Sequence, residues 1–85
     1  MTDLAPFAPI PVPPLGPRPG SEAVTLAGWL AEVGEAVAAG RPVAELTVPG
    51  LLVEAVSPAD GVLVRRNVAA GGRVDLHEPL GWVER

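Results

Sequence analysis

Few side chains in this sequence can act as nucleophiles, bases or metal ligands. The chain has one histidine, His77, no cysteine, and six basic residues that are all arginine. A single imidazole with no second imidazole or thiolate cannot complete a structural or catalytic metal site. The carboxylates are dispersed, and no two of them form the close pair that acid–base catalysis needs. The sequence therefore predicts no catalytic residue, no metal site and no enzymatic activity.

A tight turn at Pro49-Gly50 is the most distinctive candidate site. Proline fixes φ near −65° at the first central position, and glycine accepts a positive φ at the second, so the pair predicts a type II turn. The flanking residues Val48, Leu51 and Leu52 are apolar. Because side chains alternate along a strand, at least one of the two leucines is expected to point outward. A small apolar patch of this kind is typical of a contact site, so we predict these five residues as interaction residues.

A second interpretation of the same tip remains open. Leu51 can fold inward while Leu52 lies flat on a neighbouring strand. In that case the tip has no partner, and its apolar composition reflects drift.

The segments that would position this turn are short apolar runs separated by glycine and proline. They continue to the end of the chain, with the last two at residues 73–79 and 80–85, and this spacing predicts an all-β sandwich or barrel. An amphipathic helix over residues 29–39 is the alternative, although three glycines interrupt that segment. Near the start, Ile10, Val12 and Leu15 can form an edge strand, where proline is tolerated.

Composition narrows the class of protein. The chain has 85 residues, 8.7 kDa, and apolar residues that are mainly alanine and valine, so we expect one small domain with an aliphatic core. A net charge of −4 argues against nucleic acid as a partner. The absence of cysteine, of a cationic leader and of a long apolar run predicts a cytoplasmic protein without membrane contact.

Two further polar residues are expected to be structural. Asp60 lies in the turn Ser57-Pro58-Ala59-Asp60-Gly61, where an aspartate carboxylate commonly accepts hydrogen bonds from nearby backbone. His77 precedes Glu78-Pro79 and is predicted to be a loop residue.

The sequence also contains an internal repeat with an offset of 37 residues. Two copies of one unit can share a core about a pseudo-twofold axis, each covering the apolar face that the other cannot hide alone. The Pro49-Gly50 turn lies between the copies. Under this offset the matching pairs are Leu26 and Leu63, Gly34 and Gly71, Val37 and Val74, Pro42 and Pro79, Val43 and Leu80, and Leu46 and Val83.

Several blocks of sequence follow the order and spacing of a known carrier domain. The central block, residues 43–64, reads VAELTVPGLLVEAVSPADGVLV. On these blocks the chain, from about residue 10 to its end, resembles the biotinyl and lipoyl carrier domains. It is most similar to the lipoyl domain of dihydrolipoamide acyltransferase components of 2-oxo acid dehydrogenase complexes. The other blocks are PPLG at 13–16, AGWL at 27–30, VGEAV at 33–37, GRPVAEL at 40–46, AGGRV at 70–74 and EPL at 78–80.

The resemblance implies a fold but removes the usual chemistry. It implies a flexible lead-in at residues 1–8 and a carrier-like domain at 9–85, folded as a flattened barrel (barrel-sandwich hybrid) of two antiparallel sheets. The family's attachment hairpin reads roughly A-E-I-E-T-D-K-A, and its modified lysine falls on Gly50, with the preceding aspartate on Pro49. Lipoyl or biotinyl attachment forms an amide with a lysine ε-amine, which no residue here supplies. No cofactor is therefore predicted.

A retained framework without its attachment residue leads to two expectations about function. The first is a non-lipoylated domain that acts as a protein interaction or assembly module, with a protein partner in or beside a 2-oxo acid dehydrogenase or acyl-transfer complex. The alternative is a degenerate carrier domain that this machinery still recognises although it carries no prosthetic group. Neither expectation fixes the identity of the partner or the oligomeric state.

Overall fold

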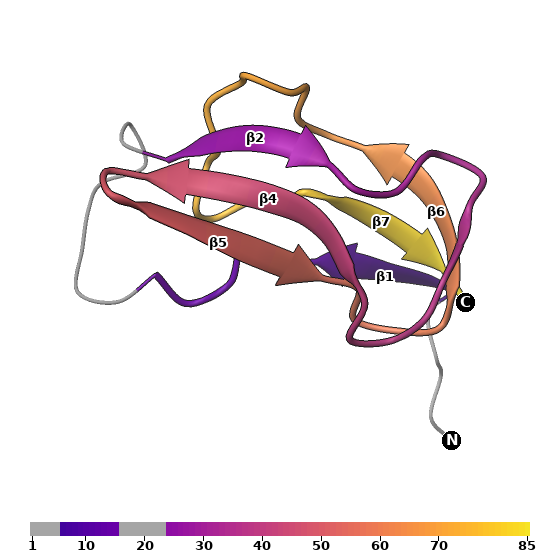
Figure 1. Ribbon diagram of the computed structural model, residues 1–85. Coiled ribbons are helices and arrows are strands. Elements are labelled where there is room, and N and C mark those ends of the chain that lie inside the picture. Colours follow the sequence, from indigo (N-terminus) through magenta and orange to yellow (C-terminus); the bar gives the residue numbers. More distant parts are fainter. Residues whose placement is uncertain (1–5, 16–23) are drawn as a thin grey trace.

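The computed structural model describes residues 6–15 and 24–85, and its regular elements are all strands (Figure 1). No helix occurs within these residues, so the alternative of a helix over 29–39 is wrong and the all-β prediction is confirmed. The strands are β1 (Phe7–Ile10), β2 (Thr25–Trp29), β3 (Ala36–Val37), β4 (Pro42–Val48), β5 (Leu51–Val56), β6 (Gly61–Arg66) and β7 (Gly81–Glu84).

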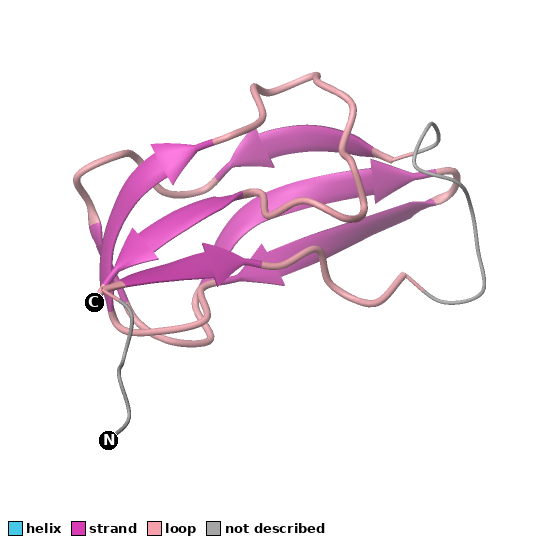
Figure 2. Ribbon diagram, turned by 180° about the vertical axis from the view of Figure 1, so that it is seen from behind, coloured by secondary structure: helices cyan, strands magenta, loops and turns pink. Residues whose placement is uncertain are grey.

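The strands form two sheets in which all neighbours are antiparallel. One sheet has the order β1-β7-β6-β3, and the other has the order β2-β4-β5. Figure 2 shows the loops gathered at the two ends of the strands. Within the described residues the two sheets remain separate, and no continuous ladder closes them into one barrel.

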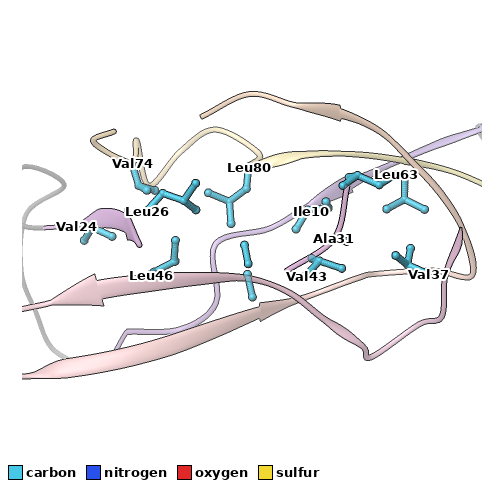
Figure 3. Close-up of a cluster of buried hydrophobic side chains, with 13 residues drawn as sticks. Ile10, Val24, Leu26, Ala31, Val37, Val43, Leu46, Leu63, Val74 and Leu80 are labelled. Carbon is cyan, nitrogen blue, oxygen red and sulfur yellow. The ribbon is translucent and has the colours of Figure 1, made fainter. Parts of the chain in front are cut away.

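The core lies between the sheets and is aliphatic, as the composition predicted (Figure 3). Alternate residues along each strand point inward, so Leu26, Leu46 and Leu63 are fully buried while their neighbours reach solvent. Trp29 is only partly buried and packs against this cluster from its side. The other buried members are Ile10, Val24, Ala31, Val37, Val43, Ala44, Ala55, Val74, Leu80 and Val83.

The two halves of the chain repeat each other's hydrogen bonds at the predicted offset. The Gly71 N–H donates to the Leu26 carbonyl at 2.8 Å, and the Gly34 N–H donates to the Leu63 carbonyl at 2.7 Å. Replacing each residue by its equivalent, 37 positions away in the other half, converts one bond into the other with donor and acceptor preserved. Gly34 and Gly71 also share a positive φ, 95° and 87°. Each half therefore holds a turn of the other half, and the predicted repeat is present in the backbone.

The same correspondence extends to the edges of the sheets. β1 pairs with β7 in the register in which β5 pairs with β4. Pro9 lies opposite Trp82, and Glu54 lies opposite Glu45, two partners that are themselves 37 residues apart. Pro9 and Glu54 thus occupy equivalent positions on the outer edges of the two sheets.

Three boundaries differ from the sequence-based expectations. β1 begins at Phe7, so residues 7 and 8 belong to a strand rather than to the lead-in. Val12 and Leu15 lie beyond β1, because the partner strand begins at Gly81, opposite Ile10, and offers no residue for them to pair with. Residues 73–79 form a loop with a single bridge from Arg73 to Thr25. The loop turns at Asp75, whose carboxylate accepts the His77 N–H at 2.9 Å.

Candidate interaction site at the tip of a hairpin

The Pro49-Gly50 turn joins β4 and β5 as a two-residue hairpin. Val48 and Leu51 are directly opposite each other in the ladder, which leaves Pro49 and Gly50 as the central residues. Gly50 has φ of 78°, close to the value that a type II turn requires at its second central position. Both central residues are exposed, so the hairpin ends in solvent as the sequence predicted.

The side chains beside this turn form a small apolar surface, which we call the tip surface and define as Val48, Pro49, Gly50, Leu51 and Leu52. Leu51 and Leu52 are each 55% exposed, so the expectation that at least one of them points outward is met. Val48 is partly buried and packs against the core.

The two leucines belong to opposite faces of the smaller sheet. Leu51 lies opposite Val48, on the face that carries the buried Leu46 and Ala55, but it extends past the end of the core. Leu52 lies opposite Thr47 on the outer face. A partner that wraps around the hairpin end can therefore contact one leucine on each side.

No ionisable side chain belongs to the tip surface. The nearest charges along the outer face are Glu45 and Glu54, which are directly opposite each other in the β4–β5 ladder. The tip is consequently neutral and apolar, with a pair of carboxylates behind it. Its chemistry suits desolvation against another apolar surface rather than proton transfer or anion binding.

Gly50 leaves open space at the end of the hairpin. A Cβ placed there would meet no heavy atom within 4 Å, so a side chain at this position would project freely into solvent. The position is therefore exposed and unobstructed, and it carries no functional group. The sequence contains no lysine that a different register could place there.

The remaining polar residues singled out from the sequence have structural roles. Asp60 bonds to a different segment rather than to its own turn. Its Oδ1 accepts a hydrogen bond from the Ala39 N–H at 2.8 Å. The turn is instead held by Ser57, whose hydroxyl donates to the Ala59 carbonyl at 2.7 Å. His77 is an exposed loop residue, as predicted. No group of three histidine, cysteine or acidic residues in the described segments is placed to bind a metal.

One cluster was not found from the sequence. The Trp29 indole N–H donates to the Val68 carbonyl at 2.8 Å, and the Arg66 guanidinium lies over the indole ring, 5.8 Å from its centre. These residues line an open pocket of about 560 Å³ together with Asn67, Ala69 and Ala70. The internal repeat could have predicted this contact. Its offset makes Arg66 the equivalent of Trp29, and equivalent residues can meet at the pseudo-twofold axis. The pocket contains no nucleophile or base.

One ion pair braces the turn before β3. Arg41 Nη2 lies 2.8 Å from Glu35 Oε2, and the Glu32 N–H donates to Glu35 Oε1 at 2.9 Å. The backbone hydrogen bond from Glu32, followed by the one from Arg41, lowers the pKa of Glu35 from its ordinary 4.5. This carboxylate stabilises a turn and faces no reacting group.

Comparisons with known proteins do not assign the chain to a family. No protein-family model matches it, and no curated protein sequence matches it either. The described residues include no helix that is long and apolar enough to span a bilayer.

Proposed function

We propose that this chain is a lipoyl-like domain that carries no prosthetic group and acts as a protein interaction or assembly module through its tip surface. The observation that carries the proposal is the β4–β5 hairpin. It is exposed in the manner of an attachment hairpin, and it ends in Gly50 flanked by two leucines that are each 55% exposed.

The architecture supports this proposal at a second level. Two antiparallel sheets, hydrogen bonds repeated at an offset of 37 residues, and a hairpin between the two copies are the features expected of a flattened carrier-type barrel with a pseudo-twofold axis. In this proposal the barrel is retained as a scaffold, and its former attachment end is the contact surface. The partner is a component of a 2-oxo acid dehydrogenase or acyl-transfer complex in the cytoplasm.

Exposed leucines on a small protein supply binding energy when a partner removes them from water. Full burial of a leucine side chain is worth roughly 1.5–3 kcal/mol, and Leu51 and Leu52 are already half-buried. The tip surface alone therefore supports a weak contact, of the kind seen in transient assembly.

The test measures binding to purified 2-oxo acid dehydrogenase components with Leu52→Asp and a matched control. Leu30→Asp places the same charge on another exposed leucine, 43% exposed and outside the hairpin. We expect Leu52→Asp to weaken binding by about tenfold or more, as for a contact at the centre of an interface, and Leu30→Asp to leave it within about threefold. Equal losses in the two variants, or no binding by the unaltered chain, would contradict the proposal.

A second function, retained recognition by the modifying machinery, is favoured by the open space at Gly50. If the hairpin is still recognised, Gly50→Lys should be lipoylated by a lipoate ligase, and mass spectrometry would detect the added group. Gly40→Lys is the matched control, because Gly40 also has a positive φ and open space but lies in a different turn. A folded Gly50→Lys variant that takes up no lipoyl group would exclude this function.

A further inference from the structure

β5 borders the smaller sheet, and among the described residues no strand pairs with its outer side. Val48 and Leu51 flank a two-residue turn and therefore form a hydrogen-bonded pair, so the alternation of an antiparallel ladder directs the N–H and C=O groups of Leu52 and Glu54 away from β4. Within the described residues no hydrogen bond reaches these outward groups. They form a short row of donors and acceptors along the border of the sheet.

The equivalent border on the other sheet is protected. Pro9 occupies in β1 the position that Glu54 occupies in β5, and it has no N–H to offer to another strand. Pro11 follows two residues later with the same effect. Proline on an edge strand is a common way in which proteins prevent pairing between molecules. Of two equivalent edges, this molecule therefore blocks one and leaves the other able to pair.

The side chains of β5 also favour pairing. Its sequence, LLVEAV, contains no proline and one charge, and Leu51, Leu52 and Val56 are 55%, 55% and 41% exposed. A long, apolar and unprotected edge strand is a template for another strand.

We propose that two copies of this chain pair through their β5 edges, antiparallel and related by a twofold axis, with Val53 facing Val53. Only registers in which the outward groups of Leu52 and Glu54 meet outward groups can form the ladder. In the proposed register Leu52 of one copy lies opposite Glu54 of the other. Of the two neighbouring registers, one would place the two Glu54 carboxylates directly opposite each other, which is unfavourable. The other would place Leu52 opposite Leu52 and Glu54 opposite Gly50 of the turn, beyond the end of the strand.

The proposed partner is a second copy of the chain because β5 can pair with another β5. A twofold interface uses the same patch on both molecules, and here each charged residue meets an apolar one. The two smaller sheets would join into one sheet of six strands. One pair of six-residue strands makes a small interface, and small interfaces are typical of weak association. We therefore expect a dissociation constant on the order of tens of micromolar. This inference does not depend on the proposed function, since it concerns the chain alone.

The test begins with the unaltered chain. Sedimentation equilibrium should show an average mass that rises from 8.7 kDa towards twice that value as concentration increases. Hydrogen exchange should show, over the same range, increasing protection of the Leu52 and Glu54 amides, which have no partner within the described part of one copy. A chain that stays monomeric up to about 1 mM, or amides whose exchange does not change, would overturn the proposal.

A matched pair of variants locates the interface. Glu54→Pro copies the protection that β1 already has at Pro9, and it should weaken association by about tenfold or more while the β4–β5 ladder remains. Glu54→Gln removes the charge but keeps the N–H, and it should associate at least as tightly as the unaltered chain. A folded Glu54→Pro variant that dimerises normally would overturn the proposal. If Glu54→Pro does not fold, the amide protection of the unaltered chain decides.

Discussion

Gly50 holds the hairpin tip in a backbone conformation that L side chains rarely adopt. Its φ is 78°, and the space around its Cβ position is empty, so only the backbone restricts which residue can stand there. Gly28, in β2, also has open space but not the left-handed backbone. Because neither position is crowded, comparing the two glycines isolates the effect of the left-handed backbone conformation.

We expect Gly50→Ala to lower the free energy of unfolding by about 1–2 kcal/mol, because alanine is strained at positive φ. Gly28→Ala should leave stability unchanged or raise it by about 0.5–1 kcal/mol, because alanine in a strand loses less conformational freedom than glycine. Urea unfolding of both variants measures the difference. Equal effects of the two substitutions would show that the tip does not need its left-handed residue.

Glu35 gives the protein a stability that depends on pH. Its pKa is lower folded than unfolded, chiefly through the Glu32 N–H and then through Arg41, so the ionised form is favoured by folding. This contribution is fully present above the ordinary pKa of 4.5 and is lost as the pH falls through the folded-state value.

Glu35→Gln should therefore destabilise the protein at neutral pH, and the difference from the unaltered chain should shrink as acid protonates Glu35. Thermal unfolding across this pH range tests the prediction. Glu84→Gln, which removes an exposed carboxylate with no described side-chain hydrogen bond, is the control. A Glu35→Gln effect that does not change between neutral and acidic pH would mean that the ion pair is not the cause.

At the scale of single elements, equivalent strands in the two halves of the internal repeat are alike but not identical. Ala44 in β4 corresponds to Gly81 in β7, and both face the core. At Gly81 the neighbouring strand and ring approach closely. A Cβ there would collide with the Arg65 carbonyl oxygen and would lie 3.2 Å from the Trp29 ring. The Trp29 ring therefore packs over β7 at position 81, where only glycine fits without displacing a neighbour.

Gly81→Ala should lower the free energy of unfolding by about 1–3 kcal/mol, because the added methyl group must displace backbone or the indole. The near-ultraviolet circular dichroism of the tryptophans should change with it. If the variant is as stable as the unaltered chain, the β6–β7 ladder is looser than the structure describes.

The sequence predicted most elements, because glycine and proline mark the turns between short apolar runs. It predicted the turn at Pro49-Gly50 and the internal repeat for the same reason. It placed His77 in a loop but did not predict that the loop extends over residues 73–79, since an apolar alternation does not reveal whether a neighbouring strand is available. It also missed the hydrogen bond that the Ala39 N–H donates to Asp60, because contacts between distant segments depend on the completed fold. Leu51 and Leu52 are both exposed because the core ends before the hairpin tip. Sequence periodicity does not show where the core ends.

At the scale of the whole molecule, hydrogen bonds join the two halves of the internal repeat in both directions. Leu26 and Leu63 are fully buried, each bonded to a turn in the other half. The Leu26 N–H donates to the Gly72 carbonyl at 2.9 Å, and the Leu63 N–H donates to the Glu35 carbonyl at 3.0 Å. Neither half can open without breaking hydrogen bonds of the other, so the halves should unfold together.

Native-state hydrogen exchange should therefore report the same opening free energy at the Leu26 and Leu63 amides, within about 0.5 kcal/mol, and both should equal the global value. Urea unfolding followed by fluorescence and by circular dichroism should give coincident transitions. Opening free energies that differ by more than about 1 kcal/mol would show that one copy opens before the other.

The pairing of β1 with β7 determines how the molecule responds to mechanical force. Phe7 lies opposite Glu84. Figure 1 shows that β1 begins and β7 ends at the end of the molecule away from the β4–β5 hairpin. Tension applied through these two residues would peel β1 from β7 one hydrogen bond at a time, and such unzipping offers little resistance.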